Sequence, residues 1–175
     1  LVFICVGPNN CYDLAEDLKR AKAVISCEND MATVNGLQKL TGNPNIYFGI
    51  PDVVTSNTAP TELLVEDSLM VVTEQGMLVL EKGDYTLPEV ILQVGPDELH
   101  MHWMCKLFIH NAPHAIVAYL GWLKGYTYIH EAMADSDINE VVVGSISEIT
   151  DGVIAAGFAE KDYANNYKQK ELKRF

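Results

Sequence analysis

Lys106, Asn111 and His114 stand out because they interrupt the largely apolar stretch MCKLFIHNAPHAIVAYLG. A lysine withdrawn from water loses its proton more easily, so it can serve as a general acid or base at cellular pH. An asparagine amide can donate to an oxygen that gains negative charge, and a neutral histidine can orient a hydroxyl or a carbonyl. Together the three residue types suit reversible proton transfer at an alcohol or carbonyl centre, while a hydride moves elsewhere.

The spacing of these residues does not suit a straight α-helix. At about 100° per residue, Lys106 and Asn111 would point about 140° apart, and Lys106 and His114 about 80° apart. Pro113 lacks a backbone donor and pushes Ala112 away from helical dihedrals. We therefore predict a break or kink at HNAPH that lets the three polar tips meet. The alternative is that Lys106 extends to water, Asn111 caps a helix and His114 is an ordinary half-buried histidine.

A metal site is the other chemistry that this region could support, because four histidines and one cysteine fall between positions 100 and 114. His100 and His102 point about 200° apart on a helix and so do not share a face. His110 and His114 do share one, at i and i+4, but the glutamate of the H-E-x-x-H motif is absent. We therefore predict no metal.

The elements that precede this region alternate between strand and helix. Continuous apolar runs predict strands over residues 1–7, 23–29 and 45–54, the first two buried on both faces. The segments between them, 8–21 and 30–42, are expected to be helices. Strand, helix, strand, helix, strand predicts a parallel sheet with crossover helices.

Ligands of such sheets bind at the carboxyl ends of the strands. Those ends are VGPNN (Val6–Asn10), CEND (Cys27–Asp30) and the neighbourhood of Asp52. Ordinary turns would explain the same polar residues, and for VGPNN that interpretation is the simpler one.

Two further β-rich segments follow, at residues 68–83 and 89–95. The first is expected to form a hairpin around Gln75 and Gly76, and both look like antiparallel strands appended to the parallel sheet.

From Asp97 onward the chain is expected to be helical. Four helices are predicted, over residues 97–110, 113–135, 138–157 and 160–175. The fold class is therefore a partial α/β Rossmann-like domain at residues 1–95, followed by a mostly α-helical domain at residues 96–175.

Composition limits the possible partners. The 175 residues include 24 acidic and 12 basic side chains, a formal net charge of −12. This balance argues against a nucleic-acid partner, which needs a basic face, and against an anionic membrane surface. A small anionic substrate stays possible, because a pocket can differ from the average. The oligomeric state cannot be read from the sequence.

Cysteine usage and apolar run length bear on location. The four cysteines show no C-x-x-C spacing, and we interpret them as reduced and mostly buried, which suits the cytoplasm. No apolar run reaches the roughly 18 residues of a membrane span. The chain starts at Leu1 inside a predicted strand and stops at Phe175 without a helix-closing signal, so we expect a fragment.

Taken together, these segments resemble the polyol-specific long-chain dehydrogenases of the mannitol dehydrogenase family. The resemblance runs from Leu1 to Phe175. It rests on VGPNN, on ISCEN (Ile25–Asn29), on KLFIHNAPHAIVAYLG followed by GYTYIHEAM, and on the helix ending in KRF.

The resemblance implies an N-terminal domain that binds NAD, a helical substrate domain, and metal-independent interconversion of a sugar alcohol and a ketose. It implies that Lys106 is the general acid/base, that Asn111 holds the developing oxyanion and that His114 orients the substrate oxygen. It also implies that the backbone of Val6 and Gly7, together with Glu28 and Asn29, lines the cofactor.

The chain departs from the family pattern at several places. The family's first strand and Gly-rich phosphate loop should precede Leu1. Val53 stands where the family commonly has an arginine after Asp52, and Phe48 stands where some members have a polar group. Substrate recognition is therefore expected to differ. Lys124 is a candidate contact for a substrate phosphate on its helix position alone, but a solvated lysine is the simpler interpretation.

Two alternatives stay open. A keto-sugar-acid reductase would use the same machinery on a carboxylate-bearing sugar, and a degenerate relative would bind only a nucleotide or a partner protein. The expected partner is otherwise a small polyol or sugar phosphate.

Overall fold

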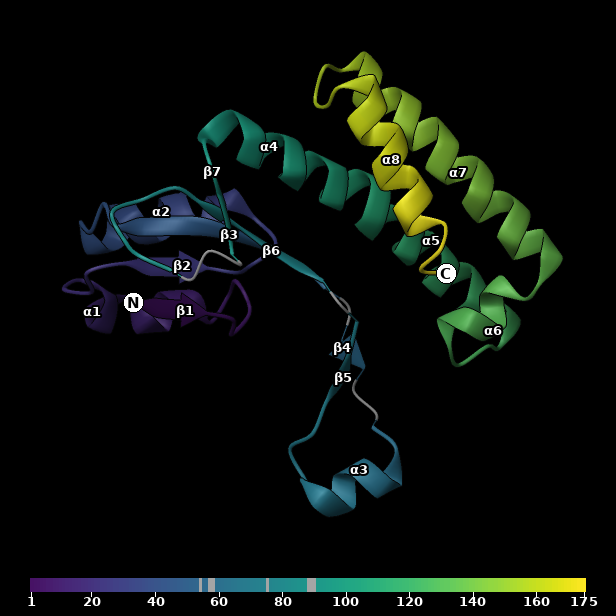
Figure 1. The fold of residues 1–175 in the computed structure, drawn as a ribbon, viewed down its shortest axis with the longest axis horizontal. Helices are drawn as coiled ribbons and strands as arrows, with labels where there is room; N and C mark the ends of the chain where they lie inside the picture. The colour runs from purple at the N-terminus through teal and green to yellow at the C-terminus, as the bar shows by residue number, and fades with distance from the viewer. Residues whose placement is uncertain (54, 57–58, 75, 88–90) are drawn as a thin grey trace. The chain divides into compact units, whose positions relative to one another are not determined.

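A computed structural model describes residues 1–53, 55–56, 59–74, 76–87 and 91–175 of the chain. The chain divides into two compact units, Leu1–Leu99 and His100–Phe175. The first unit carries the sheet, and the second is helical (Figure 1). The predicted domain boundary between residues 95 and 96 stays a prediction.

Five strands of the described residues form one sheet in the order β1-β2-β3-β6-β7. Their bounds are Val2–Ile4 for β1, Val24–Ser26 for β2, Ile46–Asp52 for β3, Met77–Glu81 for β6 and Leu92–Val94 for β7. The first three strands run parallel, β6 runs antiparallel to β3, and β7 runs parallel to β6. The predicted parallel sheet with appended antiparallel strands is confirmed.

The two crossovers differ in how closely they follow the prediction. The helix predicted at 30–42 is α2 (Met31–Thr41). Asp30 caps it by accepting from the Thr33 amide at 2.6 Å, and Gly42 ends it at φ 68°. The helix predicted at 8–21 is shorter: a 3-10 turn, η1 (Cys11–Leu14), leads into the four-residue α1 (Ala15–Leu18).

Strand β1 corrects one expectation. We predicted a strand buried on both faces, but Val2 is 39% exposed and Phe3 44% exposed, while Ile4 is buried. The reason is that β1 lies at the edge of the described sheet and pairs only with β2. All three residues of β2 are buried, as expected for an inner strand.

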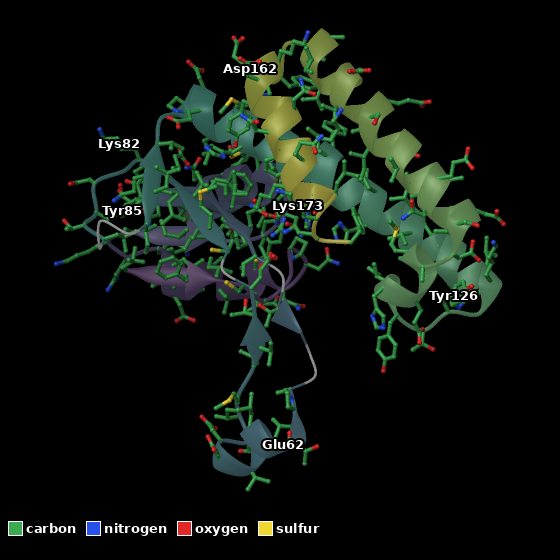
Figure 2. All side chains as sticks on the ribbon, turned by 45° about the vertical axis from the view of Figure 1, so that its right-hand side comes forward. Glu62, Lys82, Tyr85, Tyr126, Asp162 and Lys173 are labelled. Carbon is green, nitrogen blue, oxygen red and sulfur yellow. The ribbon has the colours of Figure 1, made fainter. Side chains whose placement is uncertain are left out.

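A short two-stranded ribbon lies between β3 and β6 in the sequence, although these two strands are neighbours in the sheet. Strand β4 (Thr55–Ser56) pairs antiparallel with β5 (Val72–Thr73), and α3 (Thr61–Glu66), which carries Glu62, lies between them in sequence (Figure 2). The hairpin predicted within 68–83 is therefore wrong for the described residues, because β5 pairs with β4 whereas β6 pairs with β3. Pairing with β3 lets β6 bury Val79 and Leu80. Gln75 of the predicted turn lies outside the described residues.

The helical unit packs around one apolar core. Its helices are α4 (Pro96–Met104), which begins in the first unit, the π-helical segment η2 (Cys105–Asn111), α5 (Ala112–Lys124), α6 (Ile129–Met133), α7 (Ser136–Ala155) and α8 (Lys161–Glu171). The predicted helix 113–135 is divided into α5 and α6 because Gly125, at φ 86°, ends α5. Helix α8 lies beside α7 and η2. Ile109, Val117, Val142 and Ile146 are fully buried in the core between them.

The four cysteines are free thiols. Cys11 and Cys105 are buried and Cys27 is half-buried, but Cys5 is exposed because it follows the edge strand β1.

No helix in the described part of the chain has both the length and the apolar character needed to cross a membrane.

Candidate functional site

The stretch that carries Lys106, Asn111 and His114 is continuous helix rather than a broken one. Lys106 and Asn111 lie in η2, and His114 lies in the first turn of α5. Asn111 (φ −68°, ψ −39°) and Ala112 (φ −66°, ψ −47°) both keep helical dihedrals, so a break at HNAPH is wrong, while the alternative, a kink, stays a prediction. Pro113 is tolerated because it falls in the first turn of α5, directly after the π-helical hydrogen-bond pattern ends.

The π-helical geometry changes where the side chains point. Backbone hydrogen bonds of a π-helix join residues five apart, so each turn holds more residues than the 3.6 of an α-helix. Lys106 and Asn111 are five residues apart and therefore lie at a smaller angle than the roughly 140° of a straight α-helix. All three candidate catalytic side chains are half-buried. Convergence of their tips on one point stays a prediction.

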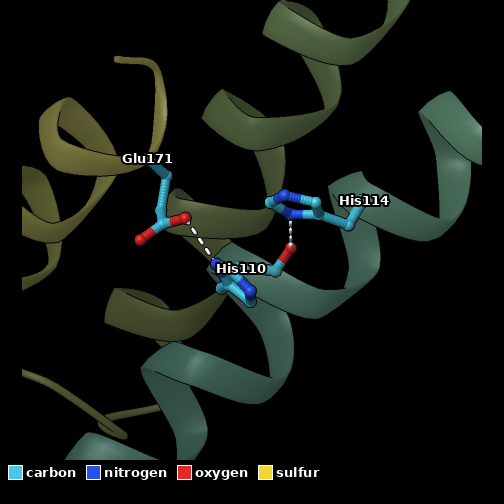
Figure 3. Close-up of side chains that lie close together, drawn as sticks. All are labelled: His110, His114 and Glu171. Carbon is cyan, nitrogen blue, oxygen red and sulfur yellow. Dashed lines mark hydrogen bonds and ion pairs between the residues drawn. The ribbon is translucent and has the colours of Figure 1, made fainter. Parts of the chain in front are cut away.

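His114 has a defined hydrogen-bond arrangement. Its Nδ1–H donates to the carbonyl oxygen of His110 at 2.8 Å, which leaves Nε2 as the acceptor of the neutral ring (Figure 3). The ring centroid lies 4.3 Å from that of His110 and 4.4 Å from that of Phe175. Burial lowers the pKa of His114 below 6.5, although the hydrogen bond to the His110 backbone opposes this effect. The neutral ring is therefore the favoured form.

A buried ion pair lies next to His114. The His110 Nδ1–H donates to Oε2 of Glu171 at 2.6 Å, and Nη1 of Arg174 donates to Oε1 of the same carboxylate at 2.7 Å. The Glu171 side chain is fully buried, and that of Arg174 is 8% exposed. Sequence reasoning missed Glu171, because nothing local indicates that a residue 61 positions after His110 is its partner.

The same residues form the one described cluster with a metal-like donor set. Ligand atoms of His110, His114 and Glu171 all lie within 4.8 Å of one another. However, Nδ1 of His114 already donates a hydrogen bond to the carbonyl oxygen of His110. The Glu171 carboxylate accepts from both His110 and Arg174. A guanidinium 3.1 Å from Nδ1 of His110 would also repel a cation. The donor set therefore fits an ion-pair network better than a metal centre.

The candidate cofactor residues lie at the carboxyl ends of β1 and β2. One carboxylate oxygen of Glu28, Oε1, accepts from the Val6 amide at 2.8 Å and from the Gly7 amide at 2.9 Å. Glu28 is only 8% exposed, and Gly7 has φ +88°, a conformation that favours glycine. The structure thus brings Val6, Gly7 and Glu28 together, with Asn29 exposed beside them.

The thiol of Cys11 also points to Glu28, at 3.5 Å. Burial, followed by the charge of Glu28, raises the pKa of Cys11 to about 11. Cys11 is therefore a neutral thiol that lies behind this loop and not a nucleophile.

The structure also describes the residues at which the family pattern or a phosphate contact was considered. Phe48 is buried in the sheet core, and Asp52 is buried at the end of β3, whereas Val53 is exposed. Lys124 Nζ contacts both carboxylate oxygens of Asp135 at 2.9 Å and Asp137 at 3.0 Å. These carboxylates neutralise Lys124, which argues against a phosphate contact there.

The helical half of this chain matches a known protein family. Residues 98–175 match the mannitol dehydrogenase C-terminal domain family. These residues belong to that family. The resemblance of the whole chain to the polyol-specific long-chain dehydrogenases is thereby confirmed, with similarity to mannitol-1-phosphate 5-dehydrogenases in particular.

Two curated relatives, both named mannitol-1-phosphate 5-dehydrogenase, extend the similarity into the sheet. The protein of Clostridium acetobutylicum is 33% identical over 79% of this chain, and that of Caldanaerobacter subterraneus subsp. tengcongensis is 31% identical over 92% of it. The aligned parts cover 35% and 40% of those proteins, so this chain spans well under two thirds of their length.

A solved structure supports the fold. The crystal structure of 2-dehydropantoate 2-reductase from Geobacter metallireducens GS-15 superposes with a TM-score of 0.60 at 13% identity, over 97% of this chain and 59% of that protein. The predicted Rossmann-like α/β domain followed by a mostly helical domain is therefore confirmed.

Proposed function

We propose that the protein carrying this mannitol dehydrogenase domain is an NAD-dependent oxidoreductase that interconverts a sugar alcohol, or its phosphate, and the corresponding ketose. The relatives named mannitol-1-phosphate 5-dehydrogenase support the substrate class. The observation that carries the proposal is the π-helical segment, because its geometry narrows the angle between Lys106 and Asn111 directly before a histidine whose pKa burial lowers.

Lys106 is the general acid/base in this proposal. In the oxidation it removes the proton of the substrate hydroxyl, and in the reduction it returns a proton to the carbonyl oxygen. Its half-buried position on η2, five residues before Asn111 and eight before His114, supports the role.

Asn111 and His114 hold the reacting oxygen. The Asn111 amide donates to the oxygen while negative charge develops on it. The neutral His114 accepts the substrate hydroxyl through Nε2, the nitrogen that the bond to His110 leaves as acceptor.

The residues of the sheet unit fit a dinucleotide. Val6, Gly7, Glu28 and Asn29 lie at the carboxyl edge of parallel strands, where such cofactors bind. Glu28 holds the loop after β1 by accepting hydrogen bonds from two backbone amides, those of Val6 and Gly7. The positive φ of Gly7 lets the backbone pass close to a ligand. When bound there, NAD would supply the hydride chemistry, and the residues of this chain would bind and orient it.

A dehydrogenase assay of the protein at full length tests the proposal. Absorbance of the reduced nicotinamide would be followed with NAD(H) and NADP(H) against fructose 6-phosphate, fructose and fructuronate. We expect turnover of a ketose or its phosphate with NADH, unchanged by a chelator. Preference for fructuronate would support the keto-sugar-acid reductase instead, and the absence of turnover with every substrate would contradict the proposal.

We also propose a cytoplasmic location, which the free thiols of the four cysteines support.

A further inference from the structure

The network around Glu171 has a feature that the proposed reaction does not use. A carboxylate with no exposure to water is costly unless it is fully paired, and Glu171 is paired on both oxygens, with His110 and with Arg174. His110 is the last residue but one of η2. The carboxylate therefore anchors the end of the π-helical segment to α8.

An anchor at this position would hold the uncommon π-helical backbone in place. A π-helix is rare and occurs mostly as short segments within α-helices, often at functional sites. An unusual backbone geometry persists only where the surrounding structure holds it. The His110 ring, fixed by Glu171, packs against the ring of His114, and the His110 carbonyl accepts from that same ring. Asn111 directly follows His110 in the chain.

We propose that Glu171 is a positioning residue, which acts through His110 to hold the end of the π-helical segment and thereby Asn111 and His114 in their working geometry. The inference rests on the proposed function for its kinetic consequence. Glu171 itself touches no reacting atom in this scheme.

The chain offers a matched control. His102 on α4 is also buried, and its Nδ1 lies 2.7 Å from the hydroxyl of Tyr163 on α8. This pair has the same sequence separation, 61 residues, as His110 and Glu171. The two pairs thus link the same two helical stretches, but only one of them lies at the π-helical segment.

The test compares Glu171→Gln with Tyr163→Phe in the full-length protein. Both substitutions are nearly isosteric. Glu171→Gln removes the negative charge and one of the two acceptor oxygens that bind His110 and Arg174, and Tyr163→Phe removes the hydroxyl that contacts His102. We expect Glu171→Gln to lower kcat by roughly ten- to a hundredfold at an unchanged KM for NAD, because a small misplacement of catalytic groups has that effect. Tyr163→Phe should keep kcat close to wild type. Equal kcat values for the two variants, measured well below their melting temperatures, would overturn the inference.

A double-variant cycle tests whether Glu171 acts through His110. If it does, adding Glu171→Gln to His110→Phe should cause little further loss of kcat. Fully additive losses would overturn the inference. A wild-type protein without turnover would instead contradict the proposed function.

Histidine ¹⁵N spectra provide a readout that needs no turnover. Wild-type His114 should show the tautomer with its proton on Nδ1. Glu171→Gln should shift or broaden the His114 signals, whereas Tyr163→Phe should leave them in place. Identical His114 signals in wild type and Glu171→Gln would overturn the inference even if the protein proved inactive.

Discussion

Oε2 of Glu171 lies 2.6 Å from Nδ1 of His110, although the two residues are 61 positions apart in the sequence. This contact joins α8 to the π-helical segment that carries the candidate catalytic lysine. It also makes the last residue of α8 part of the core of the helical unit, since the Glu171 side chain is fully buried.

Removal of this carboxylate should destabilise the protein strongly. We expect Glu171→Ala to lower the free energy of unfolding by about 3–5 kcal/mol, because it removes the fully buried carboxylate that pairs with the His110 ring and the Arg174 guanidinium. Urea unfolding would measure the change. Glu160→Ala, at an exposed position before α8 with no side-chain cap bond, is the control and should unfold close to wild type. Equal stabilities of the two variants would contradict the ion-pair network.

The lowered pKa of His114 predicts a dependence of stability on pH. Because the folded state holds the pKa below its unfolded value of 6.5, the unfolded state binds the proton more readily. The stabilising contribution is thus complete above pH 6.5 and is lost as the pH falls through and below that value. We expect the melting temperature of wild type to drop more than that of His114→Gln between about pH 7.5 and 5.5.

The control for this measurement is His130→Gln, which replaces an exposed histidine of α6 and should keep the wild-type profile. An NMR titration that placed the pKa of His114 above 6.5 would refute this prediction.

Glu28 should matter for the loop after β1. We expect Glu28→Ala to lower the free energy of unfolding by about 1–3 kcal/mol, because the Val6 and Gly7 amides lose their acceptor, and to weaken NAD binding. Urea unfolding and a fluorescence titration with NADH would measure the two effects. Glu16→Ala removes an exposed carboxylate that pairs with Lys19 on the surface, and serves as the control. NAD affinity equal in both variants would argue against a cofactor role for this loop.

Gly121 should tolerate no side chain. A Cβ at this position would lie 2.7 Å from the Cβ of Ala132, so Gly121→Ala would push α5 and α6 apart. We expect a loss of about 1–3 kcal/mol in the free energy of unfolding. Gly144→Ala, in α7, meets no atom within 4 Å and should instead stabilise the protein by about 0.5–1 kcal/mol. Equal effects of the two substitutions on urea unfolding would contradict the close approach of α5 and α6.

Local chemistry explains which elements the sequence could predict. Asp30 and Gly42 mark both ends of α2 through a cap bond and a left-handed residue, and these signals need no information from elsewhere. Gly125 is a similar signal, because its left-handed backbone ends α5 within the single helix predicted at 113–135. The parallel direction of the first three strands could also be predicted, because strands joined by crossover helices run parallel in one sheet.

Tertiary partners decided what the sequence could not predict. Pro113 suggested a break, but the backbone changes its hydrogen-bond pattern over η2 instead. The residue types alone do not predict a π-helical segment. Glu171 carries no local signal that it faces His110. The exposure of Phe3 depends on the position of β1 at the sheet edge, and strand hydrophobicity does not encode that position.

The central claim is that Lys106 exchanges the proton with the substrate, and Lys106→Ala in the full-length protein tests it most directly. Lys124→Ala is the matched control, because that lysine is partly exposed and paired with Asp135 and Asp137. We predict that Lys106→Ala lowers kcat by about 10²–10⁴-fold with NAD affinity unchanged, while Lys124→Ala keeps turnover near wild type. Wild-type turnover in Lys106→Ala would contradict the account.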